Sequence, residues 1–238
     1  MLVLLALIIV NCNNPTEKRQ ITEEERRMYI SAQQLIESRQ FQSGVEEINK
    51  YLLIHPNDEE ALLLRGIAYK QMNDHQAALK DFSMAIELNP RYILAYINKG
   101  ELLTELDKFE EALIVYDEAL KVHPKSIECL NNRGHIKFNL NDYSGAINDF
   151  SAVLELRPGS YLAYYNRGMA QFRLENYESA LSDFTNSIGI NPEYGNAYYQ
   201  RGFIHMLLGQ KEKACYDWQT GAQYNHRTSI QIYQLNCQ

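Results

Sequence analysis

The sequence predicts an all-α fold: a right-handed α-solenoid of six antiparallel helix pairs, closed by a short C-terminal capping helix. The first observation behind this prediction is a period of 34 residues, which the prolines show at Pro56, Pro90, Pro124, Pro158 and Pro192. The second is that glycines keep the same period, at Gly66, Gly100, Gly134, Gly168 and Gly202. The third is a series of alanines, each followed four residues later by an aromatic ring, at Ala78, Ala112, Ala146, Ala180 and Ala214.

Residues 161–194 show how one repeat folds. Its first and second halves each carry apolar residues at the three-and-four spacing that places side chains on one face of a helix. A short polar break at Glu175 separates the halves, and Pro192 ends the second helix because proline has no N–H to donate. We expect the small residues Gly168 and Ala180 to face each other where the two helices cross.

The turn between the two helices needs a residue that tolerates the left-handed backbone conformation. Glu175 is expected to adopt it at a small cost in stability. The other repeats have better suited residues at this place, namely Asn73, Asp107, Asn141 and Gly209.

A helix pair of about 34 residues cannot bury its own apolar face, so neighbouring pairs must stack and form one concave and one convex face. Residues 25–58 fit the pattern more loosely and are predicted to be an atypical N-terminal repeat, opened by a capping box of Thr22 and Glu25. The predicted organisation is a signal segment 1–12, a polar tether 13–24, repeats 25–58, 59–92, 93–126, 127–160, 161–194 and 195–228, and a C-terminal cap or tail 229–238.

Within each repeat, counted from residue 59 onward, the eighth residue is Gly, the twentieth is Ala and the thirty-second is Pro, except for His226 in the last unit. The twenty-fourth residue is always aromatic: Phe82, Tyr116, Phe150, Phe184 and Trp218. This pattern resembles the tetratricopeptide repeat (TPR), although the usual Tyr at the eleventh place survives only as Tyr69. The resemblance implies stacked helix pairs that bind a partner polypeptide on their concave face.

Composition argues against several functions. A net charge of −7 disfavours general nucleic-acid binding, which needs a basic surface. The six histidines fall in no metal-binding spacing, and no catalytic motif is present. We therefore expect no enzymatic activity, no metal, no cofactor and no small-molecule substrate. Cys129 and Cys215 occupy apolar repeat positions and are expected to be buried free thiols; with Cys237 in the tail, no disulfide framework is evident.

Charged pairs recur with the repeat. In four repeats an arginine precedes the glycine and an aspartate follows 16 residues later, whereas repeat 93–126 lacks both and has Lys99 and Val115. This joint loss predicts that the arginine and aspartate of one repeat form an ion pair. A ladder between neighbouring repeats, such as Asp149 with Arg167, is the alternative. The predicted pairs are Arg65–Asp81, Arg133–Asp149, Arg167–Asp183 and Arg201–Asp217.

The N-terminal segment differs from the rest of the chain. Residues 2–10 are consecutively apolar, too few to span a bilayer but suited to an export signal. The run leads to Cys12, and the segment resembles a bacterial lipoprotein signal, which implies lipid attachment at Cys12. A signal also carries Lys or Arg before its apolar run, so we expect translation to start upstream of Met1. The alternative is a buried apolar arm or a misassigned start.

In TPR proteins, defined positions of each first helix line the concave groove and hold the ligand. The resemblance therefore predicts a partner-binding groove that becomes apolar and aromatic toward the C-terminus, a composition typical of interaction surfaces. The alternative is that the chain's own C-terminal tail covers these apolar residues, so that they do not bind a partner. The predicted groove residues are Leu63, Ile67, Ile97, Asn131, His135, Phe138, Leu162, Tyr165, Met169, Phe172, Arg173, Tyr199, Phe203 and Met206.

The leading hypothesis is a lipid-anchored TPR scaffold or adaptor in a bacterial cell envelope, in the outer membrane rather than the inner, that binds a partner segment in this groove. One alternative is a cytosolic co-chaperone or assembly module, which requires that residues 1–12 are not a signal. The other is a docking subunit of an envelope enzyme.

Overall fold

The computed structural model describes residues 22–224 and 226–237. Within those ranges the chain forms thirteen α-helices and no strand, in agreement with the predicted all-α class. The first helices of the six pairs are α1 (Glu23–Glu37), α3 (Glu59–Gln71), α5 (Ile93–Glu105), α7 (Ile127–Asn139), α9 (Tyr161–Arg173) and α11 (Gly195–Leu207). The second helices are α2 (Phe41–Ile54), α4 (His75–Leu88), α6 (Phe109–Val122), α8 (Tyr143–Leu156), α10 (Tyr177–Ile190) and α12 (Lys211–Gln223), and α13 (Arg227–Asn236) follows them.

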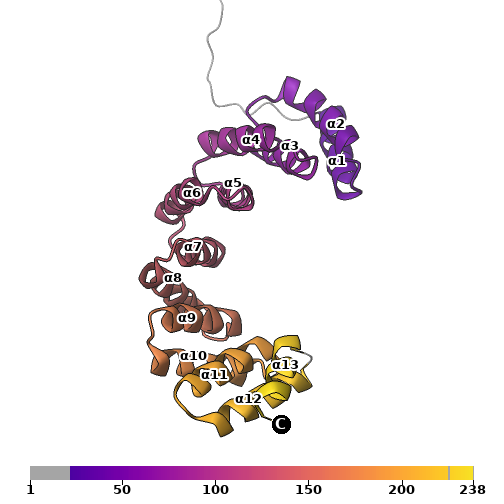
Figure 1. Cartoon of the computed structure of the whole chain (residues 1–238). Coiled ribbons are helices and arrows are strands. Elements are labelled where there is room, and N and C mark those ends of the chain that lie inside the picture. The colour runs from indigo at the N-terminus through magenta and orange to yellow at the C-terminus, as the bar shows by residue number, and fades with distance from the viewer. Residues whose placement is uncertain (1–21, 225, 238) are drawn as a thin grey trace, which may run out of the picture.

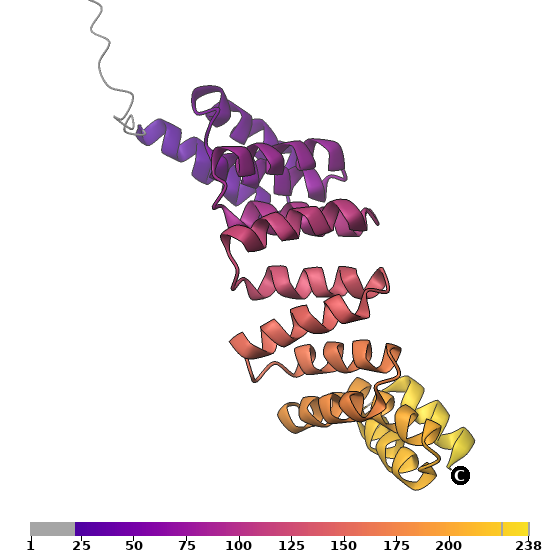
Figure 2. The ribbon, with the colours of Figure 1, turned by 90° about the vertical axis from the view of Figure 1, so that its left-hand side faces the viewer.

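The pairs stack into an open, C-shaped curve (Figure 1). The first helices lie toward the inside of the curve and the second helices toward the outside, most plainly at α5–α6 and α7–α8. After a quarter turn the helices lie one after another across the long axis of the molecule (Figure 2). Among the described residues, no helix combines the length and the hydrophobicity needed to cross a bilayer.

The N-terminal capping box is present. The Thr22 hydroxyl accepts a hydrogen bond from the Glu25 N–H at 3.2 Å, and the Glu25 carboxylate accepts one from the Thr22 N–H at 2.7 Å. Because this cap starts α1 at Glu23, the last two residues of the predicted polar tether belong to the helix. The signal segment 1–12, Cys12 and tether residues 13–21 lie outside the described residues.

The turns between paired helices have the predicted backbone. Asn73, Asp107, Asn141 and Gly209 all have positive φ, and Glu175 adopts the same conformation with φ of 60°. Arg39, which the sequence analysis did not single out, makes the equivalent turn between α1 and α2 with φ of 62°.

In the five repeats from residue 59 onward, the buried aromatic ring of the second helix lies over the glycine of the first helix. A Cβ placed on Gly168 would lie 2.9 Å from Phe184 Cε1, and one placed on Gly134 would lie 2.9 Å from Phe150 Cε1. The atoms nearest to a Cβ on Gly168 are those of the Phe184 ring, so the absent side chain makes room for this ring; whether Gly168 also faces Ala180 stays a prediction. All five rings are almost fully buried: Phe82, Tyr116, Phe150, Phe184 and Trp218.

The predicted arginine–aspartate pairs form within each of the four repeats. Arg167 donates from Nε and Nη2 to the two carboxylate oxygens of Asp183, at 2.9 and 2.7 Å. Asp183 is only 4% exposed, and its hydrogen bonds raise the pKa of Arg167 above the ordinary value. The remaining Nη1 reaches the preceding repeat, at Ser151 Oγ. A link between repeats thus exists, but its partner is Ser151 rather than Asp149.

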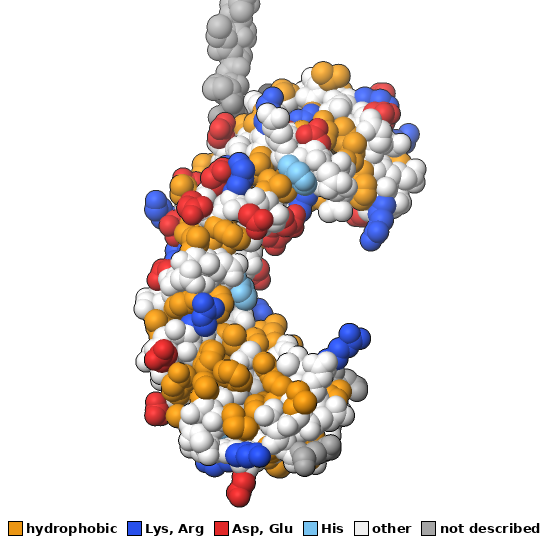
Figure 3. Space-filling model, viewed as in Figure 1, with side chains coloured by type: hydrophobic (Ala, Val, Ile, Leu, Met, Phe, Trp, Pro, Cys, Tyr) orange, Lys and Arg blue, Asp and Glu red, His pale blue; other side chains and the backbone are white. Residues whose placement is uncertain are grey.

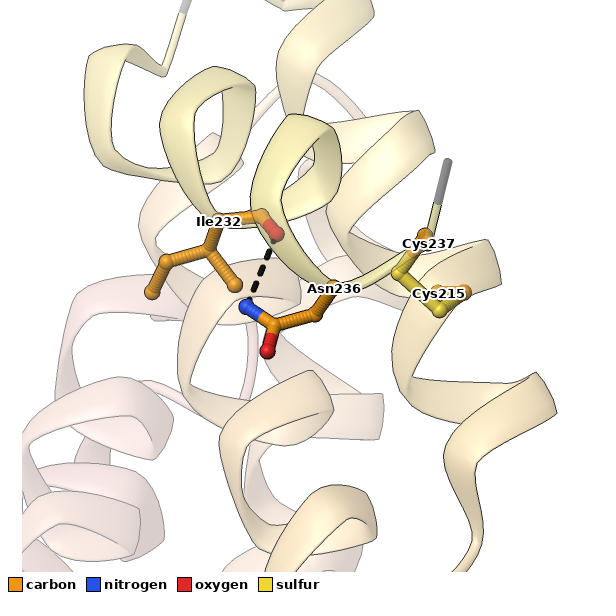
Figure 4. The surroundings of a disulfide bond; sticks show 4 residues. All are labelled: Cys215, Ile232, Asn236 and Cys237. Carbon is orange, nitrogen blue, oxygen red and sulfur yellow. Dashed lines mark hydrogen bonds between the residues drawn. A yellow bond between two sulfur atoms is a disulfide. The ribbon is translucent and has the colours of Figure 1, made fainter.

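The C-terminal helix forms as predicted but begins two residues early, at Arg227. His226 starts it, because its Nδ1 accepts the N–H of Ser229 at 3.2 Å. Helix α13 packs mainly on α12, and Cys237 at its end forms a disulfide with Cys215 of α12 (Figure 4).

This disulfide corrects the prediction for Cys215. The returning course of α13 brings the two Cα atoms to 5.7 Å, within the usual range for a disulfide. The pairing joins residues 22 positions apart on separate helices, so neither the repeat pattern nor the local spacing indicated it. Cys129, in contrast, is a fully buried free cysteine as predicted.

A double-mutant cycle tests the ion pairs. Asp183→Ala leaves Arg167 without its carboxylate and should cost about 3–5 kcal/mol of unfolding free energy, because the pair is largely buried. The coupling between Asp183→Ala and Arg167→Ala, measured by urea denaturation, should be about 1–3 kcal/mol. The exposed Lys108–Glu111 pair is the control and should show about 0–1 kcal/mol. Equal coupling in both pairs would contradict a structural role for the arginine–aspartate pairs.

The disulfide should hold α13 in place. By closing a loop of this length, the disulfide reduces the conformational freedom of the opened state and raises its free energy by about 3 kcal/mol. The double change Cys215→Ser and Cys237→Ser should therefore accelerate hydrogen exchange of the α13 amides about a hundredfold. Exchange in α3, far from the bond, serves as the internal control. Unchanged exchange in α13 would show that packing alone fixes the cap.

Candidate interaction groove

The predicted groove residues lie on the first helices, which form the inner wall of the curve (Figure 1). At its N-terminal end, Leu63 and Ile67 of α3 line a pocket of about 470 Å³ together with Tyr29 of α1 and Tyr92 at the start of α5. Leu63 is buried, so it forms the floor of this pocket rather than its rim.

A second pocket, of about 630 Å³, lies beside α5 and the turn that leads into α7. Ile97 lines it, as predicted, next to the exposed Leu94. The ring of His123 closes one side and lies 2.8 Å from the carbonyl oxygen of Arg91.

In the centre of the wall, His135 links two repeats. Its ring packs against Phe150 at 5.3 Å between centroids, and its Nε2 lies 3.1 Å from Asn166 Nδ2 of α9. Desolvation lowers the pKa of the His135 imidazole, which favours the neutral ring as hydrogen-bond acceptor. Asn131, on the same helix, is half-buried.

Arg173, at the end of α9, is held over two aromatic rings. Its guanidinium lies 4.7 Å from the Tyr143 ring centroid and 5.5 Å from that of Phe138. Because a cation above a ring face is attracted to it, this stack fixes an exposed positive charge beside the apolar part of the wall.

The aromatic residues of α9 and α11 form a continuous wall. Phe172 and Phe203 meet edge to face at 5.9 Å and join the two helices. Tyr165 packs against Phe184 and Tyr194, while Tyr199 packs against Phe203. Met169, Phe172 and Tyr165 are thus partly internal, packed on the cluster around Phe184. The half-buried residues of this wall are Tyr165, Met169, Phe172, Tyr199, Phe203 and Met206.

The most exposed apolar groups of the wall stand at its margins. Leu162 is 46% exposed and Leu207 is 53% exposed. Helix α13 lies on α12 and touches the wall where the His226 ring meets Tyr199 at 5.2 Å. The described part of the tail therefore covers the end of the last repeat and leaves both leucines accessible.

Sequence reasoning missed three tyrosines of the wall. Tyr29 holds the fifth position of the atypical first repeat, whose groove positions were not carried over from the family. Tyr92 and Tyr194 hold the last position of their repeats, just before the next first helix. Their recurrence at that position was the available signal. No group of three or more His, Cys, Asp or Glu residues in the described ranges is arranged to hold a metal ion.

Comparison with family models decides the family. One tetratricopeptide-repeat model matches residues 59–92 and 161–194, and a second matches 93–126 and 127–160, together more than half of the chain. The chain is a TPR protein. These four ranges coincide with four of the six repeats predicted from the period. Comparison with curated protein sequences finds no match.

Solved TPR structures share the fold. YrrB, described as a TPR protein with an unusual peptide-binding site, is 19% identical with a TM-score of 0.68 over 80% of this chain and 99% of its own. A TPR protein from Parabacteroides merdae is 20% identical with a TM-score of 0.66, covering 91% of this chain and 100% of its own. PilW, described as a type IV pilus biogenesis factor, is 17% identical with a TM-score of 0.68, covering 89% and 98%. At these identities the likeness establishes the fold alone.

TPR proteins are scaffolds for protein–protein interaction, and this chain is a TPR scaffold. The concave wall of first helices is its candidate binding surface.

Proposed function

We propose that this TPR protein is a lipid-anchored scaffold of a bacterial cell envelope, which holds an apolar segment of a partner protein against the wall formed by α9 and α11. The observation that carries the proposal is the aromatic wall itself, with Leu162 and Leu207 exposed at its margins. An apolar surface of this kind on a concave face is typical of a partner-binding site.

The disulfide supports an envelope location. Disulfides form and persist in oxidising compartments such as the periplasm and are rare in the cytosol. The Cys215–Cys237 bond therefore agrees with export and disfavours the cytosolic co-chaperone. In residues 1–12 an apolar run, residues 2–10, is followed closely by Cys12, and we take this segment as the export signal and Cys12 as the attachment point. Two or more acyl chains on Cys12 would give stable anchoring.

The alternative function, a docking subunit of an envelope enzyme, would use the same surface as the proposed scaffold, but its partner would be the enzyme. The likeness to PilW, a pilus biogenesis factor, and to the peptide-binding YrrB is in keeping with a role in assembly or in peptide capture. The proposal does not assign the partners of PilW or YrrB to this chain.

Metabolic labelling with a clickable fatty acid tests the anchor. The wild-type protein, expressed from its native locus, should take up label and fractionate with membranes. Cys12→Ala should remove the label, because no other residue is proposed to carry lipid, whereas Cys129→Ala should keep it. A wild-type protein without label would defeat the anchoring part of the proposal.

In-cell crosslinking followed by mass spectrometry tests the groove. Leu162→Asp combined with Leu207→Gln should reduce recovery of the partner about tenfold, since removing two exposed apolar contacts should cost the complex about 1.4 kcal/mol. These side chains are exposed, so the variant should keep its fold, unlike substitutions of Phe172 or Phe203.

The matched control is Ile114→Gln. Ile114 is 60% exposed on the second helix α6, away from the inner wall, and its change should leave recovery unaltered. Equal recovery from the groove variant and from this control would place the binding surface elsewhere.

A further inference from the structure

The inner wall of the solenoid is divided by charge. Helices α1, α3, α5 and α7 contain nine glutamates, of which Glu25 is buried, and seven Lys or Arg residues, three of which are bound to buried aspartates of second helices. Helices α9 and α11 contain no acidic residue and three arginines. In the space-filling view, acidic side chains are spread over the upper part of the curve and hydrophobic side chains gather over the lower part (Figure 3). We call these two parts the acidic half (α1, α3, α5, α7) and the aromatic half (α9, α11).

The acidic half begins at the N-terminal pocket. Glu37 and Glu60 line this pocket above its apolar floor, against one cation, Arg39. Burial raises the pKa of Tyr92 to about 12, and the negative charge of Glu60 adds to the shift. Glu60 itself is exposed, so its carboxylate is available to a ligand.

The carboxylates of α5 exceed the charge that pairs with them. The Lys70 ammonium lies 2.7 Å from a carboxylate oxygen of Glu105 and 4.0 Å from one of Glu101. Lys70 is largely covered while both glutamate side chains are half-exposed, so one ammonium shared by two carboxylates leaves an excess of negative charge facing outward. Further along, Glu128 lines the second pocket, where Lys125 is the only cation among the lining residues.

The aromatic half offers the opposite chemistry. Its arginines Arg167 and Arg201 are bound to the buried carboxylates of Asp183 and Asp217. Arg173 is stacked on aromatic rings. A carboxylate-bearing ligand would find one accessible cation here, and a basic ligand would find no acidic side chain on either helix. Apolar contact is therefore the main interaction this half can supply.

From this division we propose, building on the proposed function, that the groove recognises a bipartite polypeptide segment: a stretch rich in Lys and Arg lies along the acidic half, and an adjoining apolar stretch lies against the aromatic half. Charge complementarity assigns the basic stretch, because acidic or phosphorylated ligands would face Glu60, Glu101 and Glu128. The apolar stretch buries Leu162 and Leu207. The same carboxylates disfavour nucleic acid as a ligand, because its negatively charged phosphates bind to basic surfaces.

Synthetic peptides and fluorescence anisotropy test the proposal on the purified chain. The probe has one Lys- and Ser-rich half and one Leu- and Phe-rich half, made in both orders. Comparison peptides replace Lys by Glu or scramble the same composition. The basic–apolar probe should bind about tenfold or more tightly than the Glu version, and its binding should weaken as salt screens the charges.

The charge variant combines Glu60→Gln, Glu101→Gln and Glu128→Gln. It should weaken the basic–apolar probe about tenfold and flatten the salt dependence, because the three neutralisations remove carboxylates that attract the basic stretch. Its matched control carries the same three neutralisations on exposed glutamates of second helices, at Glu46, Glu118 and Glu155, and should bind as the wild type does. Circular dichroism confirms that both variants remain folded.

The outcomes separate this inference from the proposed function. Equal binding of the Lys and Glu probes, or equal loss in the two triple variants, overturns the bipartite assignment while a groove that depends on Leu162 and Leu207 still stands. If no peptide binds the folded chain, the bipartite assignment is also wrong. The proposed function is judged by its own result, the in-cell crosslinking of the leucine variant against Ile114→Gln.

Discussion

The contact on which the rest of the structure depends is the buried ring of the second helix lying over a glycine of the first helix, in the five repeats from residue 59 onward. The ring fills the space that the glycine leaves, so the two helices approach closely in each of these repeats. Because successive pairs are alike, small rotations add up to a regular curve with first helices inside. The bidentate Arg167–Asp183 pair and its counterparts then fix the same two helices from the side and extend one donor to the preceding repeat.

Much of the fold follows from the sequence because each local rule recurs in four or five repeats. The positive-φ turns, the proline-ended second helices and the arginine–aspartate pairs were all predictable from residues such as Glu175 and Asp183. The Cys215–Cys237 bond was not, because it depends on the path of a helix that belongs to no repeat. The position of the α1 start at Glu23 followed from the Thr22 cap rather than from the period.

The groove was predictable in location but not in accessibility. The family pattern names the positions on each first helix, yet it does not tell how far one repeat covers the next. Phe172 is half-buried because Phe203 of the following helix packs on it, and Leu63 is buried below its pocket. Such contacts depend on the angle between neighbouring repeats, which single-repeat reasoning does not provide. The charge division became visible only when the first helices were placed side by side.

The disulfide at the end of the chain also matters for the surface that lies beside it. In a stack where each unit is supported by its two neighbours, the outermost unit has one neighbour fewer and frays first. Here the outermost repeat contains α11, half of the aromatic wall, and α13 with its sulfur cross-link substitutes for the missing seventh pair. Reduction of this bond would remove one restraint on the last repeat, and a ligand that needs α11 held in place would then bind more weakly without touching either sulfur.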